Sequence, residues 1–374
     1  MLMIDDDTAE RSSSRAVILN EVKNLEARGL HSEILRLPQN NTMTSYRMTR
    51  LIVLFGVLLF LFFSQQSSAD TLRIPYVSIS GFQAPLYLGE RAGLFKKNQL
   101  EAQLIYMPGG SLIVQTLLSG EVGVASLAPP SAVAAWVKGA ELAVVAGGIE
   151  RALNVLMVNP KIKRPEDLKG KRVAISRFGS LSDISLRDAL AFYKLKPSQD
   201  VSIAQMGGLG ERMIALTSGV VDGAILNVDQ VFQAEKLGFQ ILIDLRKLPL
   251  TYSTQGIVVS REFLRGQRNI VKRFLQVYIE GIKIFKTDKE FSMDTLSRYI
   301  KTSDREILSK TYDVYRDAWE TVPLVRRDGI QQALDSIPDA KNSKLNIDSL
   351  IDNSLIQELE KEGFIRELYP EKTK

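Results

Sequence analysis

The chain has 374 residues, of which 45% are hydrophobic and 24% charged, and it carries a formal net charge of +5. This length and composition allow globular units with buried cores and exclude a disordered or fibrous chain. The 48 basic and 43 acidic residues are interspersed, with no basic tail and no stripe of arginines and aromatics, so we expect no nucleic-acid partner.

The N-terminal region has the pattern of an export signal. Arg50 precedes an apolar run of thirteen residues, Leu51–Phe63, and small residues then lead to Asp70. A basic start, a short apolar segment and a small-residue cleavage site are typical of a secretory signal peptide. Because a transmembrane helix needs about twenty apolar residues, we favour a cleaved signal at residues 43–69 and a periplasmic mature chain. A membrane anchor formed by Leu51–Phe63 is the alternative.

The segment ahead of this signal has no place in that scheme. We expect residues 1–42 to be an over-called N-terminal extension without a fold, because a signal peptide normally begins its protein. Met1, Met43 and Met48 remain possible starts.

Two residue types limit the chemistry of the exported chain. There is no cysteine, which excludes disulfides, thiolate nucleophiles and a lipid-accepting cysteine. The single histidine, His31, precedes the predicted cleavage site. A chain that starts at Asp70 therefore has no histidine general base, no Ser-His-Asp system and no ordinary zinc site. We expect a protein without metal or other cofactor that is not an enzyme.

A repeat offset by ninety-nine residues organises the rest of the chain. Residues 117–127, LLSGEVGVASL, match residues 216–226, LTSGVVDGAIL, at six of eleven positions. The same offset aligns residues 72–77 with 171–176 and residues 104–110 with 203–209, and both copies alternate strand-like and helix-like segments. Such alternation predicts parallel-type sheets flanked by helices. Two copies predict two α/β lobes with a ligand cleft between them.

The segments outside the repeat predict how the lobes connect. An apolar strand near residue 157 and a β-rich segment at Leu248–Ser260 are expected to cross from one lobe to the other and to act as a hinge. We therefore assign residues 70–157 and 254–374 to the first lobe and residues 158–253 to the second.

Three segments carry a family resemblance: APLYLGERAGLFKKNQLEAQL at 84–104, PGGSLIVQTLLSGEVGVA at 108–125, and IKRPEDLKGKRVAISRFGSLSD at 162–183. They resemble the periplasmic substrate-binding proteins of ABC importers of the NMT1/THI5-like group, which includes taurine, alkanesulfonate, nitrate and thiamine-precursor binders. The resemblance covers residues 71–365 and implies a two-lobe periplasmic-binding-protein fold of type II. It also implies a small-molecule ligand and an ABC permease as partners.

The importer's ATPase must be a separate chain, because no G-x-x-x-x-G-K-[ST] motif occurs. A nucleotide cofactor is also not expected. In GGLGERM, Met213 stands where a dinucleotide-binding loop needs a small residue. We expect the receptor to be a monomer.

Candidate ligand-binding residues lie in loops at the carboxyl ends of strands, where helix N-termini favour anions. They are Ser78, Gln83, Gly109, Gly110, Ser111, Ser131, Arg177, Gly179, Ser180, Asp183, Gly208, Asn227 and Asp229. Arg177 is expected to bind an acidic group of the ligand, and an ion pair with Asp183 or Asp229 is the alternative. The serines are equally suited to cap helices, and Gly109 and Gly208 to form tight turns.

The pattern predicts an extracytoplasmic receptor that captures a small anionic organic molecule and delivers it to an ABC importer. The alternative is an enzyme on the same scaffold in pyrimidine or other cofactor-precursor synthesis. The resemblance implies that family enzymes of the thiamine-precursor type rely on a histidine, which the chain from Asp70 onward lacks.

Overall fold

Two five-stranded sheets form the framework of the computed structural model, which describes residues 70–251, 253–337, 340 and 345–370. The predicted extension at 1–42, the predicted signal at 43–69 and its apolar run Leu51–Phe63 lie outside the described residues and stay predictions. None of the described helices combines the length and apolar character needed to cross a membrane.

The first sheet has the strand order β2, β1, β3, β10, β4. Its strands are β1 (Asp70–Tyr76), β2 (Leu100–Tyr106), β3 (Val124–Leu127), β4 (Leu142–Ile149) and β10 (Gln255–Ser260). β1 runs parallel to β2 and β3, whereas β10 runs antiparallel to β3 and β4. A strand from the C-terminal half of the chain is thus inserted into a sheet built by the first repeat.

The second sheet has the matching order β7, β6, β8, β5, β9. Its strands are β5 (Asn154–Val158), β6 (Arg172–Ile175), β7 (Ser202–Gln205), β8 (Gly223–Asn227) and β9 (Gln240–Asp244). β6 runs parallel to β7 and β8, and β5 is the antiparallel insertion between β8 and β9. The equal strand order in both sheets is the structural form of the sequence repeat.

This pairing moves one predicted boundary. β5 belongs to the second sheet along its whole length, so the first crossover occupies residues 150–153 instead of lying near residue 157. The prediction placed most of β5 in the first lobe because an apolar strand looks the same in either sheet. The return to the first sheet falls between β9 and the start of β10 at Gln255. We call the two segments, 150–153 and 245–254, the crossovers.

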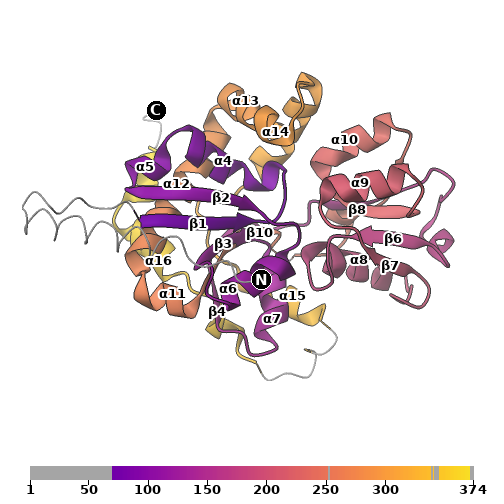
Figure 1. The fold of residues 1–374 in the computed structure, drawn as a ribbon, viewed down its shortest axis with the longest axis horizontal. Helices are drawn as coiled ribbons and strands as arrows, with labels where there is room; N and C mark the ends of the chain where they lie inside the picture. Colours follow the sequence, from indigo (N-terminus) through magenta and orange to yellow (C-terminus); the bar gives the residue numbers. More distant parts are fainter. Residues whose placement is uncertain (1–69, 252, 338–339, 341–344, 371–374) are drawn as a thin grey trace, which may run out of the picture. The chain divides into compact units, whose positions relative to one another are not determined.

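Helices cover both faces of each sheet. The second lobe contains α8 (Leu181–Phe192), α9 (Leu209–Thr217) and α10 (Val228–Lys236). Alternate β5 residues point to opposite faces: Leu156 packs in the core with α8, and Met157 in the core with α9 and α10. Figure 1 shows α9 and α10 on one side of this sheet and α8 on the other.

The remaining helices belong to the first lobe. They are α4 (Ala84–Arg91), α5 (Leu94–Lys97), α6 (Gly110–Leu118), α7 (Pro129–Trp136), α11 (Arg261–Gly266), α12 (Arg268–Thr287), α13 (Lys289–Ile300), α14 (Arg305–Ala318), α15 (Arg327–Asp335), α16 (Ser354–Lys361) and α17 (Phe364–Leu368). Short 3-10 helices are η1 (Gly81–Gln83), η2 (Pro165–Leu168), η3 (Leu245–Lys247) and η5 (Ile347–Ser349). The apolar stripe of α12 is buried at Phe274, Tyr278 and Phe285.

The repeated Ser-Gly pair ends a helix in both copies, as predicted. α6 is followed by Ser119 and Gly120, and α9 by Ser218 and Gly219. The two glycines have φ angles of 78° and 75°, in the left-handed region that favours glycine after a helix. The helices therefore stop at the same point of each lobe, and the following strands enter their sheets in equivalent positions.

Candidate functional site

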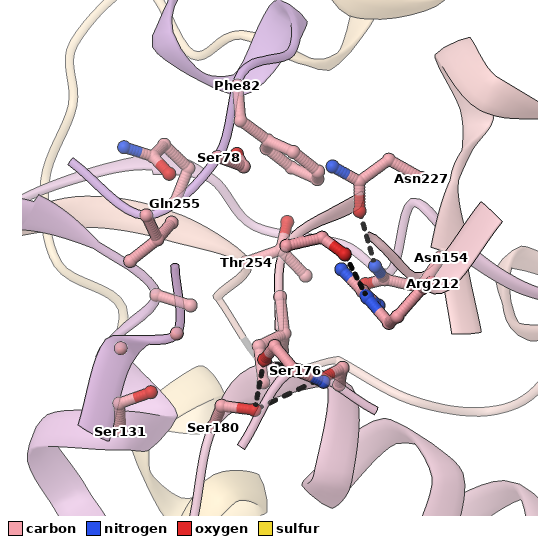
Figure 2. A pocket seen from close by; sticks show the side chains of 17 residues that line it. Ser78, Phe82, Ser131, Asn154, Ser176, Ser180, Arg212, Asn227, Thr254 and Gln255 are labelled. Carbon is pink, nitrogen blue, oxygen red and sulfur yellow. Dashed lines mark hydrogen bonds between the residues drawn. The ribbon is translucent and has the colours of Figure 1, made fainter. Parts of the chain in front are cut away.

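A cavity lies between the two lobes, next to the crossovers. Its cavity volume is about 50 Å³. Ligand pockets commonly measure about 300–1,000 Å³, so the walls leave little free space between the lobes in this structure. Its lining, shown in Figure 2, consists of Val77, Ser78, Phe82, Gly109, Gly110, Ala128, Ser131, Asn154, Ser176, Ser180, Leu181, Ser182, Gly208, Arg212, Asn227, Thr254 and Gln255.

The first lobe contributes the N-termini of α6 and α7. Gly109, immediately before α6, has a φ of 98°, and a Cβ atom there would lie 2.9 Å from the side chain of Arg177. Only glycine fits this turn without strain. At the start of α7, Ser131 is 2% exposed, and its Oγ has no hydrogen-bond partner among the described residues. A buried hydroxyl that is left unpartnered in a cavity wall is available to a ligand.

The N-terminus of α8 forms the wall opposite, in the second lobe. Three hydroxyls meet there. Ser176 Oγ lies 2.8 Å from Ser180 Oγ and 2.9 Å from Ser182 Oγ, and the Oγ atoms of Ser180 and Ser182 are 3.0 Å apart. Ser180 Oγ also donates to the carbonyl of Arg177 at 2.6 Å. The three serines hold the loop after β6 in one conformation and give the cavity a polar surface.

Among the described residues, Arg212 is the only charged side chain that lines the cavity. It lies in α9 and is 5% exposed, and burial lowers the pKa of its guanidinium to about 10. The group therefore stays protonated at neutral pH. Its Nε donates to the carbonyl of Gly208 at 3.2 Å, and its Nη1 donates to the carbonyl of Ile225.

These two bonds leave several of the five guanidinium N–H groups of Arg212 without a partner among the described residues. The charge of the adjacent Glu211 raises the pKa of Arg212 in part, but no ion pair of Arg212 occurs in that part of the chain. A buried charge without a direct counter-ion is costly, and a bound anion would reduce that cost.

Two asparagines lie beside Arg212 (Figure 2). Asn154, at the start of β5, donates from Nδ2 to Asn227 Oδ1 at 2.9 Å. The Oδ1 atom of Asn154 has no partner among the described residues, although the residue is only 3% exposed. The pair therefore offers the cavity an acceptor oxygen close to the guanidinium.

The second crossover and β10 supply Thr254 and Gln255 to the wall between the lobes. Thr254 Oγ1 donates to the carbonyl of Arg151 at 2.8 Å, which joins the two crossovers. Gln255 Nε2 donates to Ser126 Oγ at 2.6 Å, and Ser126 Oγ donates to Gln83 Oε1 at 2.7 Å. This buried network fixes the orientation of the Gln255 amide.

Seven of the thirteen predicted ligand-binding residues line the cavity. They are Ser78, Gly109, Gly110, Ser131, Ser180, Gly208 and Asn227. The other six lie outside it: Gln83, Ser111, Arg177, Gly179, Asp183 and Asp229. The residues inside follow strands directly or begin helices, so their backbone position alone brings them to the cavity.

Arg177 has a different place from the one expected. Its side chain is exposed and does not line the cavity, and its Nε donates to the carbonyl of Pro108 at 3.1 Å. Pro108 belongs to the first lobe, so Arg177 connects the lobes without an ion pair to Asp183 or Asp229 among the described contacts. The guanidinium that faces the cavity belongs to Arg212 instead.

The other predicted residues outside the cavity support its walls. Gln83 is fully buried behind Gln255, in the network described above. Asp183 accepts the N–H of Gly179 at 2.9 Å and pairs with Arg187 at 2.8 Å, so it holds the loop that carries Ser180. A Cβ atom on Gly179 would lie 4.0 Å from Ser111, which places these two loops of opposite lobes close together.

Asp229 forms a buried contact between the lobes. The residue begins α10 in the second lobe, and its Oδ1 accepts the hydroxyl of Tyr315 from α14 at 2.9 Å. Burial raises the pKa of Asp229 to about 6, and the hydrogen bonds from Tyr315, Gln230 and the Gly81 backbone lower it in part. Lys236 and Asp304 add an interlobe ion pair at 2.6 Å. The lobes are thus hydrogen-bonded to one another in this structure.

Ten residues of the lining were not among the thirteen candidates named from the sequence: Val77, Phe82, Ala128, Asn154, Ser176, Leu181, Ser182, Arg212, Thr254 and Gln255. Ser176 and Ser182 flank residues that were predicted, and strand-end position could have identified them. Arg212 has no such signal, because an arginine inside a helix looks like a solvent-exposed residue until the packing of α9 is known. In the described part of the chain, no three acidic, histidine or cysteine side chains gather into a metal site.

A protein-family model described as NMT1/THI5 like matches residues 82–290, which is more than half of the chain. The chain belongs to the NMT1/THI5-like family. This confirms the resemblance found in the sequence. The chain is also similar to the taurine-binding periplasmic protein of Escherichia coli (strain K12), with 31% identity over 176 residues. The match covers 46% of this chain and 53% of the relative, so the chain spans about half the length of that protein.

Solved structures confirm the two-lobe fold of this NMT1/THI5-like chain. The alkanesulfonate-binding protein SsuA from Xanthomonas axonopodis pv. citri, bound to MOPS, superposes with a TM-score of 0.66 at 18% identity, covering 76% of this chain and 99% of SsuA. A Candida albicans protein described as having the generic periplasmic binding protein structural fold gives a TM-score of 0.63 at 16% identity, covering 76% of this chain and 96% of that protein. At these identities the likeness concerns the fold.

Proposed function

We propose that this protein is an extracytoplasmic solute-binding receptor that captures a small organic anion between its lobes and delivers it to the permease of an ABC importer. The observation that carries the proposal is the buried guanidinium of Arg212, which faces the interlobe cavity without a carboxylate partner among the described residues. A bound acid would neutralise this charge and occupy its free N–H groups.

The backbone around the cavity favours the same ligand charge. Gly110, Ser180, Gly208 and Asn227 line it, and each begins or directly precedes a helix. Helix N-termini present N–H groups and partial positive charge, which stabilise anions. Several N-termini that face one cavity add to the field of Arg212.

The proposed partners follow from the family. The names of the relatives describe taurine-binding and alkanesulfonate-binding proteins, one of them periplasmic, and these roles support a periplasmic receptor for an importer. We propose that the receptor is a monomer in the periplasm and that the importer's ATPase is a separate chain. A protein anchored by Leu51–Phe63 would present the same cavity to the same permease.

An enzyme on this scaffold is the competing function, and the lining of the cavity favours the receptor. General acid–base catalysis needs a positioned group that titrates near neutral pH. The lining residues are neutral except for Arg212, whose pKa of about 10 keeps it charged. Such a set suits binding and orientation of an anion better than proton transfer.

The test is a thermal-shift screen of small sulfonates, carboxylates, nitrate, neutral amides and amines on the chain from Asp70 onward, followed by calorimetry with the best ligand. We expect an anion to bind most tightly. Arg212→Ala should cost about 2–4 kcal/mol of binding free energy, because it removes the partner of a desolvated charge. Arg212→Lys should recover only part, since an ammonium cannot form the planar bidentate contact.

Arg298→Ala is the matched control, because this exposed arginine pairs with Asp294 within α13 in the first lobe, lies outside the cavity and should leave the affinity within about threefold. Circular dichroism of each variant establishes that the fold is retained. Tightest binding by a neutral or cationic compound would contradict the proposal, and so would a folded Arg212→Lys variant with unchanged affinity for the anion.

A further inference from the structure

The charges that line the cavity indicate whether the ligand can carry a cationic group in addition to its acid. All seventeen lining residues are neutral except Arg212. A ligand that carried an ammonium group as well as an acid would bring that cation into a site already occupied by a guanidinium. A desolvated cation needs a carboxylate or a set of acceptors to compensate its lost hydration.

Two acidic residues that lie within two positions of lining residues have carboxylates engaged by other partners. Asp229 accepts Tyr315 on one oxygen at 2.9 Å and Gln230 on the other at 2.7 Å. Asp183 accepts Arg187 on one oxygen and the Gly179 backbone on the other.

A third carboxylate, that of Glu211, lies close to Gly208, where a Cβ atom would be 2.7 Å from its Oε2. Glu211 is exposed on the first turn of α9 and does not line the cavity. None of the three can serve a ligand ammonium without leaving its present partners or its place in solvent.

The cavity does offer an acceptor for a neutral donor. Asn154 Oδ1 has no hydrogen-bond partner among the described residues, and the amide is held by its bond to Asn227 Oδ1. Figure 2 shows this amide next to Arg212. A buried carbonyl oxygen that lacks a donor destabilises the site until a ligand hydroxyl or N–H supplies one. Ser131 Oγ, unpartnered on the first-lobe wall, can donate to or accept from the same molecule.

Taking the proposed anion receptor as given, we infer that its ligand is a compact acid whose remaining part is uncharged and carries a hydroxyl or amide donor. The acid contacts Arg212, and the donor contacts Asn154 Oδ1. Because the two protein groups are adjacent, the donor sits within a few bonds of the acid. Hydroxy- and amido-substituted sulfonates or carboxylates fit this description, and amino acids and amino sulfonates do not.

Two matched series test the inference by calorimetry at pH 7.5. The first is 2-hydroxyethanesulfonate, propane-1-sulfonate and 2-aminoethanesulfonate, and the second is 3-hydroxypropanoate, butanoate and 3-aminopropanoate. Members of each series have the same number of heavy atoms and differ only in the terminal group. We expect the hydroxyl compound of at least one series to bind about tenfold or more tightly than both of its companions.

Asn154→Ala should abolish this preference, so that the hydroxyl compound and its methyl analogue bind within about threefold of each other. Asn159→Ala is the control, because its side chain caps Lys161 in the loop after β5, away from the cavity lining. The control should keep the preference of the unaltered protein, and thermal unfolding of both variants establishes that they are folded.

The outcomes separate this inference from the proposed function. If the amino compound binds tightest, or the hydroxyl, methyl and amino compounds bind equally, the inference is overturned while the anion receptor stands. If Asn154→Ala keeps the hydroxyl preference in a folded protein, the assigned acceptor is wrong. If none of the six acids binds at millimolar concentration, the compact-acid ligand fails, and the thermal-shift screen alone decides the proposed anion receptor.

Discussion

Glu150 should make the stability of this protein depend on pH in the neutral range. The residue lies in the first crossover, where its Oε1 accepts the hydroxyl of Ser253 from the second crossover at 2.9 Å. Its Oε2 has no hydrogen-bond partner among the described residues. Burial raises the pKa of Glu150 from 4.5 to about 7, and the bonds from Ser253 and the Gly148 backbone and the charge of Arg326 lower it in part.

The sign and size of the effect follow from proton linkage. Between pH 4.5 and about 7 the folded state keeps a proton on Glu150 that the unfolded chain has released, so the free energy of unfolding falls as pH rises. The total loss is about 3 kcal/mol, since each tenfold change in proton affinity corresponds to about 1.4 kcal/mol. Between pH 6 and 8 alone, Glu150 accounts for about 1.4 kcal/mol of the fall.

Two other buried carboxyls contribute less in that interval. Burial raises the pKa of Asp188 and of Asp229 to about 6, so most of their titration is complete at lower pH. Each should add only about 0.4 kcal/mol between pH 6 and 8. Asp188→Asn is therefore the control. It changes the pH dependence of the free energy of unfolding mainly below pH 7, whereas Glu150→Gln changes it above pH 6.

The assay is urea denaturation of the chain from Asp70 onward at half-unit steps from pH 5 to pH 8.5. We expect Glu150→Gln to lose about 1.4 kcal/mol less stability than the unaltered protein between pH 6 and 8. Ser253→Ala should move the fall to higher pH, because it removes a hydrogen bond that favours the charged carboxylate. Equal slopes for Glu150→Gln and the unaltered protein would refute the reasoning.

Three further predictions concern the lobe contact, the core and the export signal. Tyr315→Phe removes the hydroxyl that Asp229 accepts across the lobes, and it should weaken ligand binding about tenfold or more by calorimetry. Tyr299→Phe is the control, because its hydroxyl bonds Glu90 within the first lobe, and it should leave the affinity unchanged. Equal affinities of the two variants would contradict a role of Tyr315 in closure. Gly281→Ala should lower the free energy of unfolding by about 1–3 kcal/mol, because the new Cβ would lie 2.3 Å from the Pro85 carbonyl oxygen. Gly266→Ala is the control, because its Cβ would meet no atom within 4 Å. Equal denaturation midpoints for the two variants would count against this packing. Intact-mass measurement of the exported protein should find an N-terminus at or near Asp70, and recovery of residues 1–42 in that protein would disprove the predicted signal.

Local patterns determined the architecture of this protein before any contact was known. The repeat between residues 117–127 and 216–226 predicted two lobes, and the structure has two sheets with the same strand order. The Ser-Gly pairs predicted helix ends, because the left-handed conformation after a helix is a property of glycine itself. Strand-end residues such as Gly109, Ser180 and Asn227 were predicted for the same reason, since parallel strands bring their carboxyl ends to one edge.

The side chains that line the cavity were decided only by tertiary packing. Arg177 directly follows a strand and looked like the anion-binding residue, yet it lies exposed on the Pro108 carbonyl, while Arg212 is buried because α9 packs it beneath Ile225. The side of the boundary on which β5 falls depends on its pairing with β8 and β9, which no property of an apolar segment reveals. Backbone conformation and hydrophobic periodicity depend on neighbouring residues, so the sequence alone predicts them. The burial of a charge and the partner of a strand arise from residues far apart in the chain, which only the folded structure brings together.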